Sequence, residues 1–374
     1  MFVQRRWRAL GQPAVLALAI LLGAGAGRLL AATPDVYEVS GVEVDATAET
    51  AAAARDTAIA EGHVKAFRQL LSRLTLRSDR DRLPDLTVNG IAAYVTDFSV
   101  ASEKTSSTRY LASLTFRFKR DAIRRLLMDY RVSFAETPSK PVLLLPAFEE
   151  AGSVLLWDVP NPWRSAWEEA SVTEGLVPLV LPLGDLTDIA AIGAEQAVRG
   201  DKQRLSAIAS RYGAGDSMVV HAVKKVDPRS GTIQLNVATT RHGPAADDQT
   251  LVHSFTSDAG ETLEALLKRA ATEIAVEIAD GWKRDNLLQF ENPAVIAVTI
   301  PIAALSEWLA IRDRLAGMAV VRSTEVILLS RTAVRVHLHF VGGTDQLTLA
   351  LAQADLALSQ DGSGWILRSV RKGS

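Results

Sequence analysis

Two periodicities of hydrophobic residues run along the chain, and they predict a mixture of strands and helices. Between Tyr110 and Phe118, apolar side chains occupy every second position, and Ser113, Thr115 and Arg117 alternate with them. A period of two predicts a strand with one buried and one solvated face. From about Ala48 to Leu74, the residues Ile59, Phe67, Leu70 and Leu74 share one face at helical spacing. A long amphipathic helix is therefore expected beside alternating strands.

The first and third parts of the chain have the same predicted order of elements. Residues 35–137 show the order strand, helix, strand, strand, helix (βαββα). Residues 291–374 show strand, helix, strand, strand, helix, strand (βαββαβ), and the last stretches, 356–359 and 365–370, could pair as a hairpin. This order is typical of ferredoxin-like domains, and we predict that architecture for both parts.

The middle part, residues 138–290, has a different pattern. Val142–Leu145 is a continuous apolar run, which indicates a strand buried on both faces. Asn161–Pro162 is a helix-start signal, since Asn caps and Pro suits the first turn. Two strand patterns flank the turn 227–231, and a helix follows from Glu261 to Trp282. We predict an α/β domain with a mixed sheet, within a three-domain protein of mixed α+β and α/β class.

The N-terminal 32 residues have the pattern of a secretory signal. Arg5, Arg6 and Arg8 precede the apolar stretch Ala14–Leu22, and small residues at 24–26 or 31–32 offer cleavage sites. The apolar stretch is short for a membrane span, which needs about 20 residues. We predict a signal peptide, or a membrane anchor if the segment is retained, and a periplasmic location for the rest. The membrane would then be contacted only through this segment.

Composition narrows the classes of function. The chain has 41 Lys and Arg against 43 Asp and Glu, for a net charge of −2, so no nucleic-acid partner is expected. It contains no cysteine, which excludes disulfides, thiolate metal sites and cysteine nucleophiles. No GxSxG, SxxK or GxGxxG motif occurs in a suitable context. We therefore expect no cofactor, and the sequence favours a protein without catalytic activity.

Several short motifs carry a family resemblance, and they are Val39–Val44 (VSGVEV), Ala51–Arg55 (AAAAR), Leu70–Thr75 (LLSRLT), Leu143–Phe148 (LLLPAF), Leu181–Asp185 (LPLGD) and Arg211–Ala214 (RYGA). Together they resemble the exported proteobacterial proteins of the domain of unknown function 2066. The central motifs are also faintly similar to envelope domains of the TolB and curli-secretion type, although the lipidation cysteine of the latter is missing. The resemblance implies export and brings no activity.

A tryptophan cluster is the most unusual local composition. Trp157, Trp163 and Trp167 lie within eleven residues, and the last two share a helix face. With Arg164 beside them, they could form a stacking platform for a cell-wall glycan or peptide. The alternative is that they seal the helix onto the sheet, as aromatic pairs at helical spacing usually do.

A second candidate cluster lies in the last domain. His337 and His339 are two apart on an expected strand, so they point to one face, where Glu325 could join them as a metal ligand. No HExxH-type signature supports a metal site there, and a solvated sheet face is the alternative.

Three functions remain open at this point. The first is an exported, non-catalytic envelope protein that acts as a scaffold or assembly factor for other envelope proteins. The second is a glycan- or peptide-binding module centred on the tryptophan cluster. The third is a metal-dependent hydrolase that uses the His337, His339 and Glu325 cluster. A bare sheet edge would favour the first, and burial of Trp163 and Trp167 would remove the second as stated.

Overall fold

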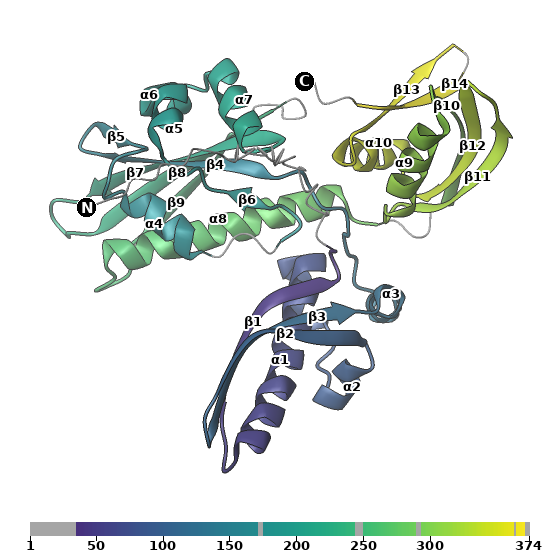
Figure 1. Ribbon diagram of the computed structural model, residues 1–374. Coiled ribbons are helices and arrows are strands. Elements are labelled where there is room, and N and C mark those ends of the chain that lie inside the picture. Colours follow the sequence, from purple (N-terminus) through teal and green to yellow (C-terminus); the bar gives the residue numbers. More distant parts are fainter. Residues whose placement is uncertain (1–34, 171–174, 244–249, 289–292, 363, 371–374) are drawn as a thin grey trace, which may run out of the picture. The chain divides into compact units, whose positions relative to one another are not determined.

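The computed structural model describes residues 35–170, 175–243, 250–288, 293–362 and 364–370, and the predicted signal segment lies outside them. The described residues contain three sheets, and each takes its strands from one of the three predicted parts (Figure 1). The mixed α/β class is thereby confirmed, while the domain boundaries at residues 137 and 290 remain predictions.

The first sheet has β3 at its centre. It is formed by β1 (Glu38–Thr47), β3 (Arg109–Phe118) and β2 (Val95–Thr105), all antiparallel. Because β1 and β2 are both antiparallel to β3, they are parallel to each other, with β3 inserted between them. The connection between β1 and β2 contains α1 (Ala51–Leu74), η1 (Arg77–Arg82) and α2 (Val88–Ala92), and α3 (Arg120–Asp129) follows β3. This is the split βαβ arrangement expected from the element order.

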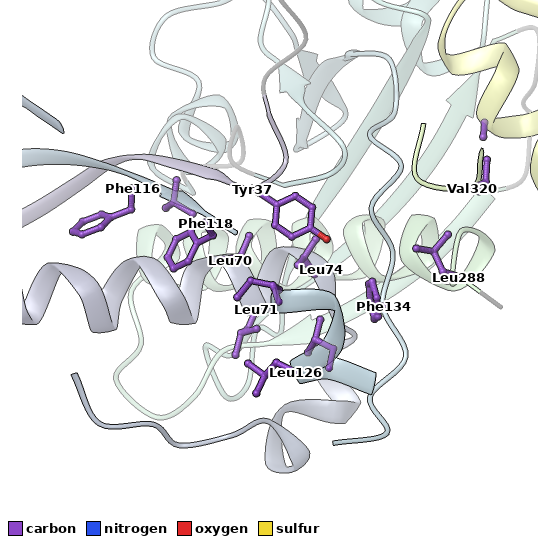
Figure 2. Close-up of a cluster of buried hydrophobic side chains, with 14 of the residues drawn as sticks. Tyr37, Leu70, Leu71, Leu74, Phe116, Phe118, Leu126, Phe134, Leu288 and Val320 are labelled. Atoms are coloured by element: carbon purple, nitrogen blue, oxygen red, sulfur yellow. The ribbon is translucent and has the colours of Figure 1, made fainter. Parts of the chain in front are cut away.

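The core of this sheet lies between β3 and α1. The apolar positions of β3 alternate with solvated ones, and Leu70 and Leu74 of α1 are fully buried. Figure 2 shows side chains from α1 and β3 in this core. The helix packs closely on the strand, because a β-carbon added at Gly62 would lie 2.9 Å from Leu114 Cδ1.

The third sheet contains one strand more than the predicted βαββαβ pattern. Its elements are β10 (Pro293–Pro301), α9 (Leu305–Ala316), β11 (Val321–Leu329), β12 (Ala333–Val341), α10 (Thr344–Gln353), β13 (Leu356–Asp361) and β14 (Gly364–Ser369). The order is β11-β12-β10-β14-β13, so the same split βαβ core recurs in β10, β11 and β12. The final hairpin turns β14 back between β10 and β13, where it runs parallel to β10.

The central sheet is covered by helices on both faces. Its strands are β4 (Val142–Glu150), β5 (Ser153–Leu155), β6 (Leu179–Val180), β7 (Asp216–Val226), β8 (Ile233–His242) and β9 (Thr250–Thr256). The order is β5-β4-β7-β8-β9, with β6 also paired to β4. Its helices are α4 (Pro162–Glu169), α5 (Leu186–Ala191), α6 (Ala194–Val198), α7 (Lys202–Arg211) and α8 (Leu263–Asp285).

Strand β4 explains why its sequence is a continuous apolar run. Val142, Leu144 and Phe148 point into a core shared with α4 and α8. Leu143 and Leu145 point into a second core shared with α6 and α7. A strand with helices on both faces needs apolar residues at consecutive positions. The expected hairpin is confirmed by the pairing of β7 with β8, including Val226 opposite Ile233.

Helix α8 lines a groove beside β9. Its first turn is capped by Thr262, whose side chain accepts a hydrogen bond from the Ala265 backbone N–H. One face of the helix, with Leu266, Leu267 and Ile274, packs against the sheet. A more polar face, bearing Arg269, Glu273 and Glu277, lies beside β9.

Candidate functional site

The tryptophans on α4 belong to the core. Trp163 and Trp167 both have 0% exposed surface, and their rings meet edge-to-face with centroids 5.6 Å apart. The indole N–H of Trp163 donates to the carbonyl of Val220 on β7 over 3.0 Å. With both rings enclosed, neither offers a face to a glycan or peptide. Two of the three rings of the predicted stacking platform are therefore not accessible to a ligand. Their helical spacing puts them on one face of α4, and that face packs against the sheet.

Trp157 and Arg164 are half-buried and make their contacts within the protein. The Trp157 indole donates to the carbonyl of Ile192 over 2.7 Å. Arg164 donates to the carbonyl of Pro182 over 2.6 Å and to the carboxylate of Glu168 over 2.9 Å. The Arg164–Pro182 bond fastens the loop before α5 to the start of α4, and the Trp157–Ile192 bond joins the segment before α4 to the end of α5.

The two central motifs meet in one hydrogen-bonded cluster. Asp188 on α5 is fully buried, and it accepts hydrogen bonds from Arg211, the Tyr212 hydroxyl and the Gly184 backbone N–H. Arg211 also pairs with Asp185 over 2.7 Å, which lowers the pKa of Asp185 to about 2. Burial beside Asp188 raises the pKa of Tyr212. The LPLGD and RYGA segments thus hold α5 to the end of α7.

The second predicted cluster is assembled on the third sheet. Glu325 lies opposite His337 across β11 and β12, and its Oε2 is 3.8 Å from His337 Nδ1 and 3.6 Å from His339 Nε2. The sequence spacing placed these groups correctly. The three side chains are 38–63% exposed on an open sheet face. Across the described ranges, no group of three His, Asp or Glu residues has a geometry that could hold a metal ion.

A cavity of about 670 Å³ lies between β9 and α8. Strand β9 contributes residues 252–256, and α8 contributes Arg269, Glu273, Glu277 and Arg284 among others. Strand β9 is last in the order of the central sheet, and no described strand pairs with its outer side. The cavity is therefore a groove between a sheet edge and a helix.

The register of β8 and β9 shows which backbone groups face this groove. The Ser257 backbone N–H donates to the carbonyl of Ile233, so 233 and 257 form a hydrogen-bonded pair. In an antiparallel ladder such pairs alternate with pairs whose N–H and C=O groups point away from the partner. Phe255 and His253 therefore bond to β8, while the N–H and C=O groups of Val252 and Ser254 point outward.

Arg269 independently supports this assignment. Its guanidinium donates to the carbonyl of Thr256 over 3.0 Å, which requires that carbonyl to point outward as the register predicts. The same guanidinium makes two bonds to Glu261, of 3.0 and 2.8 Å. The pair lowers the pKa of Glu261 to about 2. One end of the free edge is thus closed by a side chain of this protein.

Strand β9 was not among the elements predicted from the sequence. Its seven residues contain the alternation Leu251, His253 and Phe255, which is compatible with a strand. The pattern is short, and a histidine interrupts its apolar face. Its edge position depends on non-local pairing with β8, which periodicity does not encode.

No family model matches the chain, and no curated protein gives a significant match. Among solved structures, it is similar to a PelC dodecamer from Paraburkholderia phytofirmans, with 10% identity over 38% of this chain and 86% of that chain, at a TM-score of 0.25. The lipoprotein GNA1162 from Neisseria meningitidis matches with 9% identity over 38% and 99%, at 0.27.

A third solved structure, a Xanthomonas campestris protein of the domain of unknown function 330, matches with 13% identity over 39% and 83%, at a TM-score of 0.19. At these scores the overlaps do not establish a common fold. The resemblance to the domain of unknown function 2066 stays a prediction. Within the described ranges, no helix combines the length and apolar character needed to cross a membrane.

Proposed function

We propose that this protein is an exported, non-catalytic interaction factor of the bacterial cell envelope, and that it binds an extended segment of a partner protein along β9. The observation that carries the proposal is the outward-facing backbone of Val252 and Ser254 beside a groove of about 670 Å³. An extended peptide can add a strand to such an edge, with backbone hydrogen bonds giving affinity and the neighbouring helix giving specificity.

The envelope location is the part of the proposal that depends on the N-terminus. The basic n-region, short apolar stretch and small-residue sites of residues 1–32 support export. The motifs similar to exported proteobacterial proteins support it too. The glycan-binding alternative has lost its aromatic platform, because Trp163 and Trp167 are enclosed.

The chain contains no cysteine, so a single introduced cysteine can be labelled specifically. Ser254→Cys, labelled with an environment-sensitive fluorophore, reports on the groove, and Ser230→Cys in the exposed β7–β8 turn is the matched control. Peptides selected on the unlabelled protein from a random library are then titrated against both. We expect a signal change at position 254 and none at 230.

Backbone methylation of the selected peptides separates strand addition from other modes of binding. Methylation of the peptide N–H at alternate positions should abolish binding, and methylation at the intervening positions should be tolerated, because only alternate amides face β9. The proposal is overturned if no selected peptide changes the signal at position 254, or if methylation is tolerated at every position.

A further inference from the structure

Two carboxylates stand one helical turn apart on the wall of the groove. Glu273 and Glu277 lie on α8 and both line the cavity beside β9. Glu277 Oε2 is 3.4 Å from Nδ1 of His253, whose side chain is on the α8 side of the strand. Both glutamates are exposed on the helix surface. A side chain that projects from an added strand toward α8 would meet this pair.

The basic residues of the groove are at its ends or already engaged. Arg269, one turn before Glu273, is held by Glu261 and by the carbonyl of Thr256. Arg77 and Arg284 lie toward the Asp280 end, where Asp280 itself is paired with Lys283 over 2.9 Å. The middle of the groove is therefore acidic.

The spacing of the two glutamates matches the repeat of an extended chain. Four residues of an α-helix rise about 6 Å along its axis. Two residues of a β-strand advance about 6.7 Å, and they point to the same face. Side chains at positions i and i+2 of an added strand would therefore reach Glu277 and Glu273 together, whereas those at i and i+3 point to opposite faces.

We infer that the groove selects extended segments with two basic residues at positions i and i+2, a Lys/Arg-x-Lys/Arg pattern, whose cations pair with Glu273 and Glu277. The inference rests on the proposed strand addition at β9 and adds the class of partner sequence to it. Exposed ion pairs are individually weak, and two together are worth about five- to tenfold in affinity.

The experiment uses synthetic peptides with blocked ends and one host sequence of alternating Thr and Val. One carries Lys at i and i+2, a second carries Lys at i and i+3, a third carries Glu at i and i+2, and a fourth is uncharged. Binding to the full exported protein is measured by fluorescence anisotropy at low and high salt. We expect the first peptide to bind about five- to tenfold more tightly than the others at low salt, and to lose that advantage at high salt.

Matched variants assign the selectivity to the two glutamates. E273Q/E277Q should reduce affinity for the i, i+2 lysine peptide to that of the uncharged peptide. E264Q/D285N removes the same number of charges from exposed positions of α8 that do not line the groove, and should leave affinity unchanged. E273K/E277K should prefer the glutamate peptide, a gain that damage to the fold cannot produce.

The outcomes separate this inference from the function on which it rests. The inferred selectivity would be overturned if both lysine spacings bound with equal affinity. It would also be overturned if E264Q/D285N lost as much affinity for the i, i+2 lysine peptide as E273Q/E277Q does. If all four peptides bound with equal affinity and still changed the fluorescence at position 254, strand addition would be supported without the selectivity for basic residues. If none of the four changed that signal, the inference would fail, and the proposed function would fail with it if no library-selected peptide changed the signal either.

Discussion

The side chain of Asp188 is fully buried, and three hydrogen-bond donors compensate its carboxylate for the loss of water. Arg211 and the Tyr212 hydroxyl each donate over 2.6 Å, and the Gly184 backbone N–H donates over 2.9 Å. A buried charge is tolerated only when it is paired and hydrogen-bonded in this way. One side chain thus joins the loop before α5 to α7, two segments more than 20 residues apart in sequence.

Asp188→Asn should destabilise the protein by about 2–3 kcal/mol, because an amide cannot accept all three bonds and the Arg211 charge loses a partner. The matched variant Asp185→Asn keeps the side-chain oxygen that caps α5 and loses only a more exposed ion pair with Arg211, so it should destabilise the protein less than Asp188→Asn does. Urea unfolding followed by circular dichroism measures both. Equal effects of the two substitutions would contradict the role given to Asp188.

Asp185 also gives a prediction for acid stability. Pairing with Arg211 lowers its pKa to about 2 in the folded protein, below the ordinary value of about 3.9. A depressed folded pKa contributes stability above the unfolded value, and this is lost as the pH falls from about 4 to about 2. The urea midpoint should therefore fall more steeply between pH 5 and pH 2.5 in the wild type than in Asp185→Asn. Parallel curves would contradict the prediction.

Residue types alone indicated which side chains were unusual, but not where each one points. The i, i+4 spacing of Trp163 and Trp167 predicted a shared face, which the structure confirms, yet that face is the buried one. The period of two placed His337 and His339 beside Glu325, although on an open surface. Asp188 was missed, because its burial depends on Arg211 and Tyr212 approaching from another helix.

At the scale of elements, β9 has two kinds of position with different hydrogen-bonding roles. The N–H of His253 bonds to β8, and the N–H of Val252 points into the groove. Proline lacks this N–H, so its cost depends on which position it occupies. This difference provides a direct check of the register.

Val252→Pro should lower the free energy of unfolding by less than about 1 kcal/mol, since the N–H that it removes has no partner in β8. His253→Pro should cost about 2–3 kcal/mol, because it removes a ladder bond and leaves the Val237 carbonyl unpaired. Thermal unfolding of both variants makes the comparison. Val252→Pro should also weaken any peptide that binds β9. The opposite ranking of the two stabilities would show that the other set of amides faces outward.

Elements with strong local patterns could be predicted from sequence, and those defined by pairing could not. The run Val142–Leu145 and the turn after Val226 produced a correctly placed strand and hairpin. The position of β14 between β10 and β13 was missed, because strand order depends on contacts distant in sequence. The short helices α5 and α6 were missed as well, since six and five residues leave little periodicity.

Across the whole molecule, the third sheet also ends in an unpaired strand. In β11, the side chains of Val326, Ile327, Leu328 and Leu329 are each about half exposed, and β11 is last in the order of its sheet. Among the described strands, only β12 pairs with it. A long apolar edge of this kind promotes edge-to-edge association between copies.

Ile327→Lys should reduce self-association at high protein concentration, because a charge on an edge strand opposes pairing with a second copy. The free energy of unfolding should change by less than about 0.5 kcal/mol, as for most exposed substitutions. Sedimentation over a range of concentrations, with thermal unfolding beside it, measures both effects. Ser230→Lys adds the same charge at an exposed position of the β7–β8 turn, away from β11, and serves as the comparison. Unchanged association in Ile327→Lys would show that β11 does not promote it.

The contact between Arg269 and the Thr256 carbonyl sets a limit on how long any bound segment can be. The next outward-facing carbonyl after Ser254 is that of Thr256, and it already accepts a hydrogen bond from Arg269. An added strand could therefore pair with only a few backbone groups of β9, those of Val252 and Ser254 among them. In the proposed strand addition, few hydrogen bonds form and few must break, which implies brief residence and rapid exchange between partners. A short recognition sequence of this kind can also occur in unrelated proteins, so the same groove could bind several different partners one after another.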